Sequence, residues 1–450
     1  TPRAWGRRGQ SYLITEQNIK IKAGTKLKNN RPHTEEFSFR VAADVPYSHP
    51  YWLREKGTPG FYAIPHPRLT GEALSPTPLA AQVTLKADDQ ELVFNAPIFY
   101  RRRDPAAGEK IRSLEIAPRV TINFLEKVFY FAENSPKKIP VKIQGGPAPV
   151  SGKITFNVDA GWQVEPRTLS FDLKKEFAGQ DAVIVITPPK QNSTCHLTVD
   201  VSDGRVEKGR SRVEIDYPHV PRQNLFPLAG AKLVRVDLKK RGGRAAYIMG
   251  SGDEIPRYLT QVGYEVKILS DEDLQQEDLS VYDAVILGIR AYNTRSILKY
   301  SQQRLLDYVS RGGNLVLQYN VSRGLQVEQI GPYPLELSRA ARVTDELAAV
   351  TLLEPAHPIF NSPNKIRAAD FENWVQERGL YFAGKWDPRY KALLSCFDKG
   401  EEPKRGGLLA AEYGKGNFIY SGYSWFRQLP AGVPGALKLF VNMISLENRW

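Results

Sequence analysis

Polar and aromatic residues follow three of the predicted strands in the second half of the chain, in the segments "MGSGDE" (249–254), "GIRAYN" (288–293) and "QYNVSRG" (318–324). In open α/β sheets, binding sites form at the carboxyl ends of the strands, because loop side chains and free backbone donors meet there. These residue types suit a hydroxyl-rich or anionic ligand. The predicted ligand-binding residues are Asp253, Arg290, Tyr292, Asn293, Gln318, Tyr319 and Asn320. The alternative, that they only hold the loops together, is equally open.

The stretch "DFENWVQERGLYFAGKWDP" (370–388) supplies a second candidate group. We expect a helix from Asp370 to about Glu377. The flat faces of Trp374 and Trp386 could pack on a sugar ring, or the two side chains could belong to the core. Buried charges persist only with a partner or a ligand, so a structural Glu-Arg pair is the competing account. This group adds Trp374, Glu377, Arg378, Arg427 and Gln428 to the predicted ligand-binding residues.

Local motifs predict no reaction centre in this chain. The six histidines never take the H-x-x-x-H or H-E-x-x-H spacing of a zinc site. The segment "GSGDE" (250–254) lacks the Lys-Ser/Thr of a P-loop and the third glycine of a dinucleotide fingerprint. Cys396 lies in "LLSCFDKGE", outside any G-x-C-x-G turn that would present a nucleophile. We therefore predict no catalytic residue and no metal ligand here.

The chain up to about residue 225 has the pattern of β structure. Short alternating segments such as "KITFNVD" (153–159) and "AVIVITP" (182–188) are separated by clusters of Pro, Gly, Asn and Asp. Alternation with this spacing is typical of Ig-like sandwiches. A polar connector over residues 103–118 marks a boundary, so we predict two β-sandwich domains, 1–114 and 115–224.

The pattern changes after residue 225. Apolar strands at 244–250, 264–269 and 282–288 alternate with helical segments such as 253–263 and 296–313. Strands that alternate with helices form parallel βαβ units. The predicted third domain, 225–450, is therefore an α/β domain with a doubly wound, flavodoxin-like sheet.

Size and charge limit the classes of partner. A chain of 450 residues is too long for one hydrophobic core, and its net charge of +13 would suit a polyanionic partner. Because the basic residues are scattered outside two short clusters, at 101–104 and 239–244, we predict no nucleic-acid partner. No apolar run reaches eighteen residues, so we predict no membrane span. The start at Thr1 suggests a processed protein or a fragment.

Several motifs together resemble one family. The segments "GSGDEIPRYL", "GIRAYNT", "HPIFNSPNKI", "DFENWVQERGLYF" and "SWFRQLPAGVPGA" are similar to the C-terminal half of large bacterial PIG-L/LmbE-like N-deacetylases. "SHPYWLREKGTPGFY" and "DAGWQVEPRTLSFDL" resemble the β modules of the same proteins, and the second also resembles the sandwiches that accompany carbohydrate-binding modules. The resemblance implies that the last domain is class I glutamine amidotransferase-like and lacks the nucleophile.

The sequence departs from that family where its chemistry resides. Those deacetylases hold zinc through an H-P-D-D segment, whereas "PHPRL" (65–69) and "AHPIF" (356–360) lack both aspartates. The resemblance thus implies a non-catalytic accessory region without a cofactor of its own, zinc being expected only in a missing catalytic domain. The implied partners are a carbohydrate or amino-sugar ligand and that deacetylase domain of the same polypeptide, in a secreted or periplasmic setting. The alternative is a stand-alone glycan-active hydrolase or amidase built from Asp253, Glu377 and Arg290.

Overall fold

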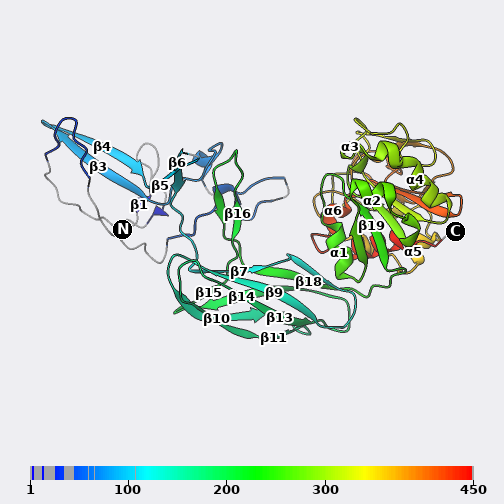
Figure 1. The fold of residues 1–450 in the computed structure, drawn as a ribbon, viewed down its shortest axis with the longest axis horizontal. Coiled ribbons are helices and arrows are strands. Elements are labelled where there is room, and N and C mark those ends of the chain that lie inside the picture. The colour runs from blue at the N-terminus through cyan, green and yellow to red at the C-terminus, as the bar shows by residue number, and fades with distance from the viewer. Residues whose placement is uncertain are drawn as a thin grey trace.

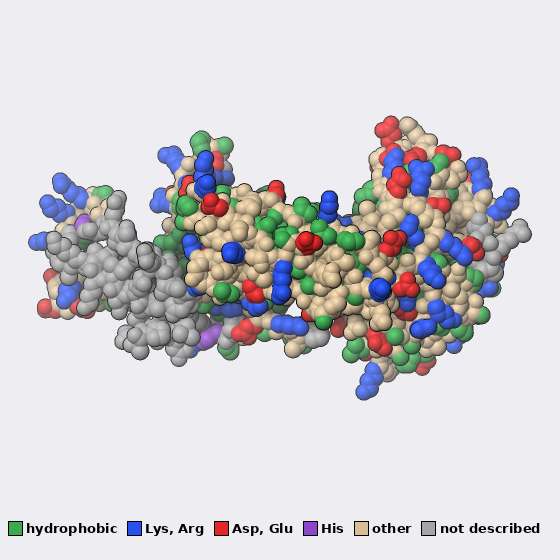
Figure 2. Space-filling model, turned by 90° about the horizontal axis from the view of Figure 1, so that it is seen from below, with side chains coloured by type: hydrophobic (Ala, Val, Ile, Leu, Met, Phe, Trp, Pro, Cys, Tyr) green, Lys and Arg blue, Asp and Glu red, His purple; other side chains and the backbone are tan. Residues whose placement is uncertain are grey.

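The computed structural model describes residues 26–34 and 45–447 apart from residues 59, 65 and 107, together with the backbone of two short paired strands, β1 (Arg3–Ala4) and β2 (Leu13–Ile14). Figure 1 shows hairpins in the N-terminal part, a β-sandwich and a C-terminal α/β domain. On the face in Figure 2, Lys and Arg side chains are interspersed with Asp and Glu over the C-terminal domain.

The N-terminal part differs from the predicted sandwich. Its described strands form two separate antiparallel hairpins, β3 (Ala80–Ala87) with β4 (Gln90–Pro97) and β5 (Phe99–Asp104) with β6 (Gly108–Ser113). The first hairpin is amphipathic, because Val83 pairs with Phe94 on one face, yet both side chains are about half exposed. Alternation in the sequence predicts strands but does not say which second layer covers them. Two short 3-10 helices, η1 (Tyr51–Leu53) and η2 (Pro67–Leu69), precede the hairpins.

The middle of the chain is an Ig-like β-sandwich. One sheet has the order β12 (Thr168–Leu173), β10 (Val150–Asn157), β14 (Ser193–Ser202), β18 (Gly230–Arg235) and β8 (Val128–Phe131), with β15 (Val206–Lys208) on β14. The other has the order β11 (Gln163–Glu165), β13 (Gly179–Thr187), β9 (Lys137–Gly145) and β7 (Val120–Phe124). A separate hairpin joins β16 (Val213–Ile215) to β17 (Gln223–Leu225). Since β18 belongs to the sandwich, the sandwich continues beyond the predicted boundary at residue 224.

The C-terminal part is an α/β domain with a mixed sheet. Five parallel strands stand in the order β20 (Glu265–Ile268), β19 (Arg244–Ile248), β21 (Ala284–Leu287), β22 (Asn314–Gln318) and β29 (Gly416–Ser421). The antiparallel strands β28 (Leu408–Tyr413) and β26 (Lys391–Ala392) extend one edge. The helices are α1 (Ile255–Gln261), α2 (Asp271–Gln276), α3 (Ala291–Thr294), α4 (Leu298–Ser310), α5 (Pro358–Asn361), α6 (Trp425–Gln428) and α7 (Pro434–Ile444), with η3 (Leu279–Val281) before β21.

Helices cover both faces of this sheet (Figure 1). Tyr247 of β19 packs in the core cluster that includes α1 and α7, whereas its neighbours Ala246 and Ile248 pack in the cluster that includes α4. Burial on both faces explains why these strands are continuously apolar rather than alternating.

A long excursion from residue 319 to residue 407 separates β22 from β28. It contains β23 (Leu335–Leu337), β24 (Thr351–Leu352), η4 (Ala368–Phe371), β25 (Ala383–Trp386) and β27 (Leu394–Ser395). The helix predicted from Asp370 to about Glu377 is wrong: only the η4 turn forms. Asn373 and Gln376 have φ angles of 58° and 69°, in the left-handed region, and a right-handed helix cannot continue through them.

The sandwich and the α/β domain share a core. Tyr130 and Val234 of the sandwich belong to the same buried cluster as α1 and α7. The ring of Tyr130 meets that of Tyr258 edge-on at 5.8 Å, and the Nζ atom of Lys137 donates to the carbonyl of Gln261 over 2.5 Å. None of the helices among the described residues combines the length and apolar character that a membrane span requires.

Candidate functional site

The candidate site lies where the chain reverses its direction across the sheet. After β19 the chain passes to β20 on one side, and after β21 it passes to β22 on the other side. The two connections therefore lead in opposite directions from neighbouring strand ends. These loops approach each other closely at Gly250, where a Cβ atom would lie 2.1 Å from the carbonyl oxygen of Ile289. The residues after β19, β21 and β22 thus share one edge, as predicted for parallel strands.

Asp253 is fixed at the base of this edge. Its carboxylate accepts hydrogen bonds from the hydroxyl of Tyr247 at 2.7 Å and from the amide of Ile255 at 3.1 Å. The side-chain amide of Gln318 donates in turn to the Tyr247 hydroxyl over 2.8 Å. Burial raises the pKa of Asp253 above its usual range. The network connects β19 to β22, and the buried Oε1 atom of Gln318 has no hydrogen-bond partner among the described residues.

Arg290 stands at the end of β21 in a left-handed conformation, with φ of 58°. Its amide donates to the carbonyl of Tyr319 over 2.8 Å, which holds the two strand ends together. The side chain is half-buried, and its Nε atom is buried without a hydrogen-bond partner among the described residues.

Three aromatic rings, those of Tyr319, Tyr381 and Phe426, form a group at this edge. The rings of Tyr319 and Tyr381 are nearly parallel, with centroids 6.3 Å apart and an interplanar angle of 11°. Phe426 approaches Tyr319 from another side at 5.5 Å. Burial raises the pKa of Tyr319, and the positive charges of Arg290 and Arg427 partly oppose this rise, so both cations lie near the phenol.

Glu377 and Arg427 complete the group. The carboxylate of Glu377, which is 8% exposed, accepts from Nε of Arg427 at 2.7 Å and from the hydroxyl of Ser424 at 3.0 Å. Arg427 also binds the side chain of Gln376 and lies 4.8 Å from the centroid of the Phe426 ring. The residues brought together here are Arg290, Tyr319, Glu377, Tyr381, Phe426 and Arg427, which we call the carboxyl-end site.

Several of the other predicted residues hold loops together. The amide nitrogen of Asn293 donates to the carbonyls of Val321 and Arg323. Asn320 accepts from the amide of Tyr292 at 2.9 Å, and the hydroxyl of Tyr292 donates to Gln302. Their hydrogen bonds are thus made within the chain, as the alternative reading of the strand ends anticipates.

Trp374, Arg378 and Gln428 are likewise engaged inside the domain. Trp374 is 3% exposed and packs against Trp425 at 5.3 Å, so it is a core residue. The guanidinium of Arg378 lies over the Trp374 ring and donates to the carbonyl of Ala348. The side chain of Gln428 donates to the carbonyl of Val375 and accepts from its amide.

Sequence reasoning missed Tyr381 and Phe426. Both belong to segments that were singled out for other residues, "GLYF" and "WFRQ". Tyr381 has a φ angle of 50°, and its left-handed backbone aligns the ring with Tyr319. No pattern in the sequence reveals such a backbone conformation at a tyrosine.

Reactive groups are sparse around this site. Among the described residues, no three His, Cys, Asp or Glu side chains gather as metal ligands. Cys396 is fully buried, its sulfur lies 3.2 Å from the Tyr423 hydroxyl, and burial raises its pKa to about 11.

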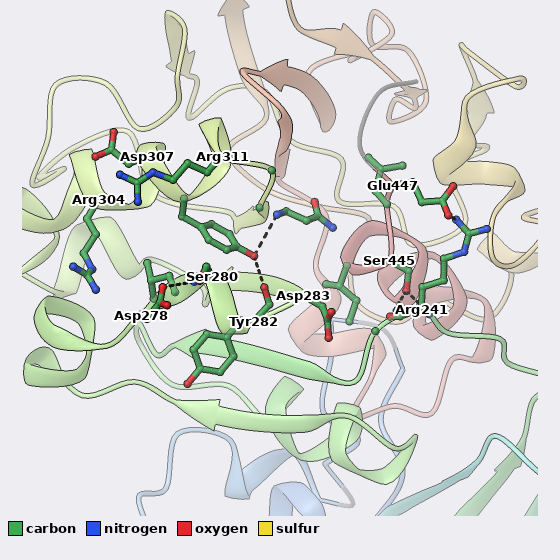
Figure 3. A pocket seen from close by; sticks show the side chains of 18 of the residues that line it. Arg241, Asp278, Ser280, Tyr282, Asp283, Arg304, Asp307, Arg311, Ser445 and Glu447 are labelled. Atoms are coloured by element: carbon green, nitrogen blue, oxygen red, sulfur yellow. Dashed lines mark hydrogen bonds and ion pairs between the residues drawn. The ribbon is translucent and has the colours of Figure 1, made fainter.

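A cavity of about 780 Å³ lies at the opposite, amino-terminal edge of the sheet. In Figure 3, Arg304, Asp307 and Arg311 line one side of it, and Arg241 and Glu447 lie on the other. Arg241 forms an ion pair with Glu447, whereas Nε of Arg304 and Oδ1 of Asn314 are buried without a hydrogen-bond partner among the described residues. Hydrogen bonds from Ser280, followed by the charges of Arg304 and Arg311, hold the pKa of Asp278 below its usual range. We place the candidate site at the carboxyl ends because ligands of open α/β sheets bind at that edge, where the strand order reverses.

No family model and no curated protein matches the chain. Among solved structures, a C. elegans MSP family member has 9% identity, covers 26% of this chain and 98% of its own, and has a TM-score of 0.17. A family 123 glycoside hydrolase from Clostridium perfringens has 10% identity and a TM-score of 0.18, and the match covers 45% of this chain and 38% of the hydrolase chain. An uncharacterized protein from Nocardia farcinica with an immunoglobulin-like fold has 15% identity and a TM-score of 0.13, and the match covers 24% of this chain and 98% of the Nocardia chain. Likenesses at this level carry no argument about function.

Proposed function

We propose that this chain is a non-catalytic accessory region that binds a saccharide at the carboxyl-end site and works beside a PIG-L/LmbE-like deacetylase domain. The observation that carries the proposal is the pair of parallel rings, Tyr319 and Tyr381, next to the guanidinium groups of Arg290 and Arg427. Aromatic faces pack on the C–H faces of sugars, and guanidinium groups donate to sugar oxygens.

The sheet supports a finer assignment of the last domain. Its parallel strands follow the order 2-1-3-4-5 along the chain, which is the flavodoxin-like order. We assign the domain to the class I glutamine amidotransferase-like kind. Its strand β22 ends at Gln318 and is followed by Tyr319, so neither residue supplies a thiol at the position of a nucleophile.

Zinc does not fit the two His-Pro segments of this chain. His66 and His357 each use Nδ1 to accept a hydrogen bond from the amide two residues ahead, at Arg68 and Ile359, and so begin short helical turns. Neither segment has the aspartates of the deacetylase motif. In this proposal, zinc therefore belongs to a separate deacetylase domain.

The core shared by the sandwich and the α/β domain supports a positioning role. Two domains joined through buried residues hold a bound saccharide at a fixed place relative to the sandwich. A partner domain attached to the sandwich would then meet its substrate in a defined orientation. The proposed setting is secreted or periplasmic.

Calorimetric titration of the chain with glucosamine, N-acetylglucosamine and oligosaccharides tests the proposal. We expect binding that Tyr381→Ala weakens by ~10-fold or more, because the substitution removes one of the stacked rings. Tyr300→Ala is the matched control, since Tyr300 is 76% exposed on α4. Release of acetate or of new reducing ends by the chain alone would instead favour the hydrolase or amidase built around Asp253, Glu377 and Arg290.

A further inference from the structure

Arg290 is a half-buried cation without an anion. Its Nε atom is buried and makes no hydrogen bond, and no described carboxylate forms an ion pair with its guanidinium. Arg427 and Arg295 of the same domain form ion pairs with Glu377 and Asp271. The guanidinium of Arg378 donates to backbone carbonyls, and Arg304 shares with Arg290 a buried Nε atom without a hydrogen-bond partner among the described residues. A charge withdrawn from water is costly unless a partner of opposite charge or several acceptors replace the water. An anion from outside the described residues would satisfy the guanidinium of Arg290.

Two carboxylates at this edge of the sheet, those of Glu377 and Asp253, form no ion pair with Arg290. Glu377 already accepts from Arg427 and Ser424. Asp253 already accepts from Tyr247 and the amide of Ile255. Both carboxylates thus have hydrogen-bond donors of their own.

Further positive charge adjoins the site. A surface hollow of about 550 Å³ is lined by Arg339, Arg342 and Tyr381, and Tyr381 also belongs to the carboxyl-end site. A volume of this size lies in the range that accommodates a small ligand. Arg339 and Arg342 therefore add positive charge next to Tyr381.

The backbone around Arg290 is held in an uncommon conformation. The described residues include seven non-glycine residues with positive φ, and four of them, Arg290, Asn373, Gln376 and Tyr381, lie on the loops of this site. Such conformations are unfavourable and persist where the surrounding structure fixes them, often at ligand sites. The positive charge of Arg290 acts on the Tyr319 phenol, where it partly opposes the rise in pKa that burial causes.

We propose that the carboxyl-end site selects an anionic saccharide of the hexuronate class, whose carboxylate pairs with Arg290 while a face of its ring packs on Tyr381. This inference rests on the proposed saccharide-binding function and adds the charge of the ligand. A planar carboxylate matches the fork of a guanidinium, and two parallel hydrogen bonds would satisfy the orphaned Nε atom together with one terminal nitrogen.

The test compares methyl β-glucuronide with methyl β-glucoside by calorimetry on the full chain. We expect the glucuronide to bind ~10-fold tighter or better, and Arg290→Gln to abolish this preference while glucoside binding is kept. Raising the ionic strength should weaken the binding of the glucuronide and leave that of the glucoside unchanged. Arg311→Gln removes the same charge at the opposite edge of the sheet and should leave the preference unchanged. The comparison in the unsubstituted chain and its salt dependence remain decisive if Arg290→Gln does not fold.

Each outcome separates the two proposals. Equal affinity for both glycosides would overturn the inference about charge and leave saccharide binding in place. Binding of neither would count against both. Inorganic phosphate or glucose 6-sulfate binding as tightly as the glucuronide would show an anion site without selectivity for a uronate, and that too would overturn the inference.

Discussion

The hydroxyl of Tyr130, on strand β8 of the sandwich, donates a hydrogen bond to the carbonyl oxygen of Leu429 in the α/β domain over 2.9 Å. Both groups are buried, and the amide of the same tyrosine donates to the side chain of Gln261 over 2.7 Å. The sandwich is thereby attached at the end of α1 and just after α6. Because these contacts are buried, the two domains should unfold together rather than one after the other.

Tyr130→Phe should reduce the free energy of unfolding by about 1–3 kcal/mol, since it leaves the buried carbonyl of Leu429 without a donor while preserving the ring. Urea denaturation followed by fluorescence measures the change. Tyr217→Phe is the control, because Tyr217 is 59% exposed and should lose almost nothing. Two separate transitions in the unsubstituted protein would contradict a shared core.

Lys137 gives the domain junction a dependence on pH. Burial lowers its pKa to about 8, below the value of ~10.4 in an unfolded chain. Between these values the unfolded state binds more protons, so stability from this group rises as the pH increases from about 8. We expect the free energy of unfolding of the natural protein, relative to Lys137→Met, to increase by about 1–2 kcal/mol between pH 8 and 9.5. Urea titrations at several pH values test this, and a flat difference would show that Lys137 is not desolvated.

The sheet of the last domain was largely predictable because its signals are local. The strand predicted at 244–250 is found as β19, and Gly263, with φ of 89°, follows the helix α1 that was predicted to end there. Fully apolar strands between amphipathic helices leave few other arrangements. The same local signals predicted strands in the first 114 residues, but not whether a second layer would pack on the hairpins.

The site was predictable only in part, because its contacts join distant segments. Glu377 and Arg427 are fifty positions apart, and both were predicted as ligand-binding residues. The sequence suggested a pair between Glu377 and its neighbour Arg378, whereas the carboxylate of Glu377 accepts from Arg427. The η4 turn and the left-handed residues after it direct Arg378 into the core beside Trp374 instead. Backbone conformation of that kind depends on tertiary packing, which a hydrophobic pattern does not encode.

The two cysteines should be inert in the folded protein. Cys195 and Cys396 are fully buried, and burial raises the pKa of each thiol to about 11. Since the thiolate is the nucleophile, a disulfide reagent such as DTNB at pH 8 should label neither native thiol and both after denaturation. Rapid labelling of one thiol in the native state would reveal an accessible nucleophile and would reopen the question of an amidase.

Gly250 tests whether the close approach of the loops after β19 and β21 is required. A Cβ atom there would lie 2.1 Å from the carbonyl oxygen of Ile289 and 2.7 Å from the amide nitrogen of Ala291. Gly250→Ala should therefore separate the loops, lower the free energy of unfolding by more than about 2 kcal/mol and displace Arg290. Gly243→Ala is the matched control, because an added Cβ meets nothing within 4 Å. Thermal unfolding and saccharide titration of both variants follow the two effects. If Gly250→Ala bound and unfolded like Gly243→Ala, the loops would not be in contact and the carboxyl-end site would not be preformed.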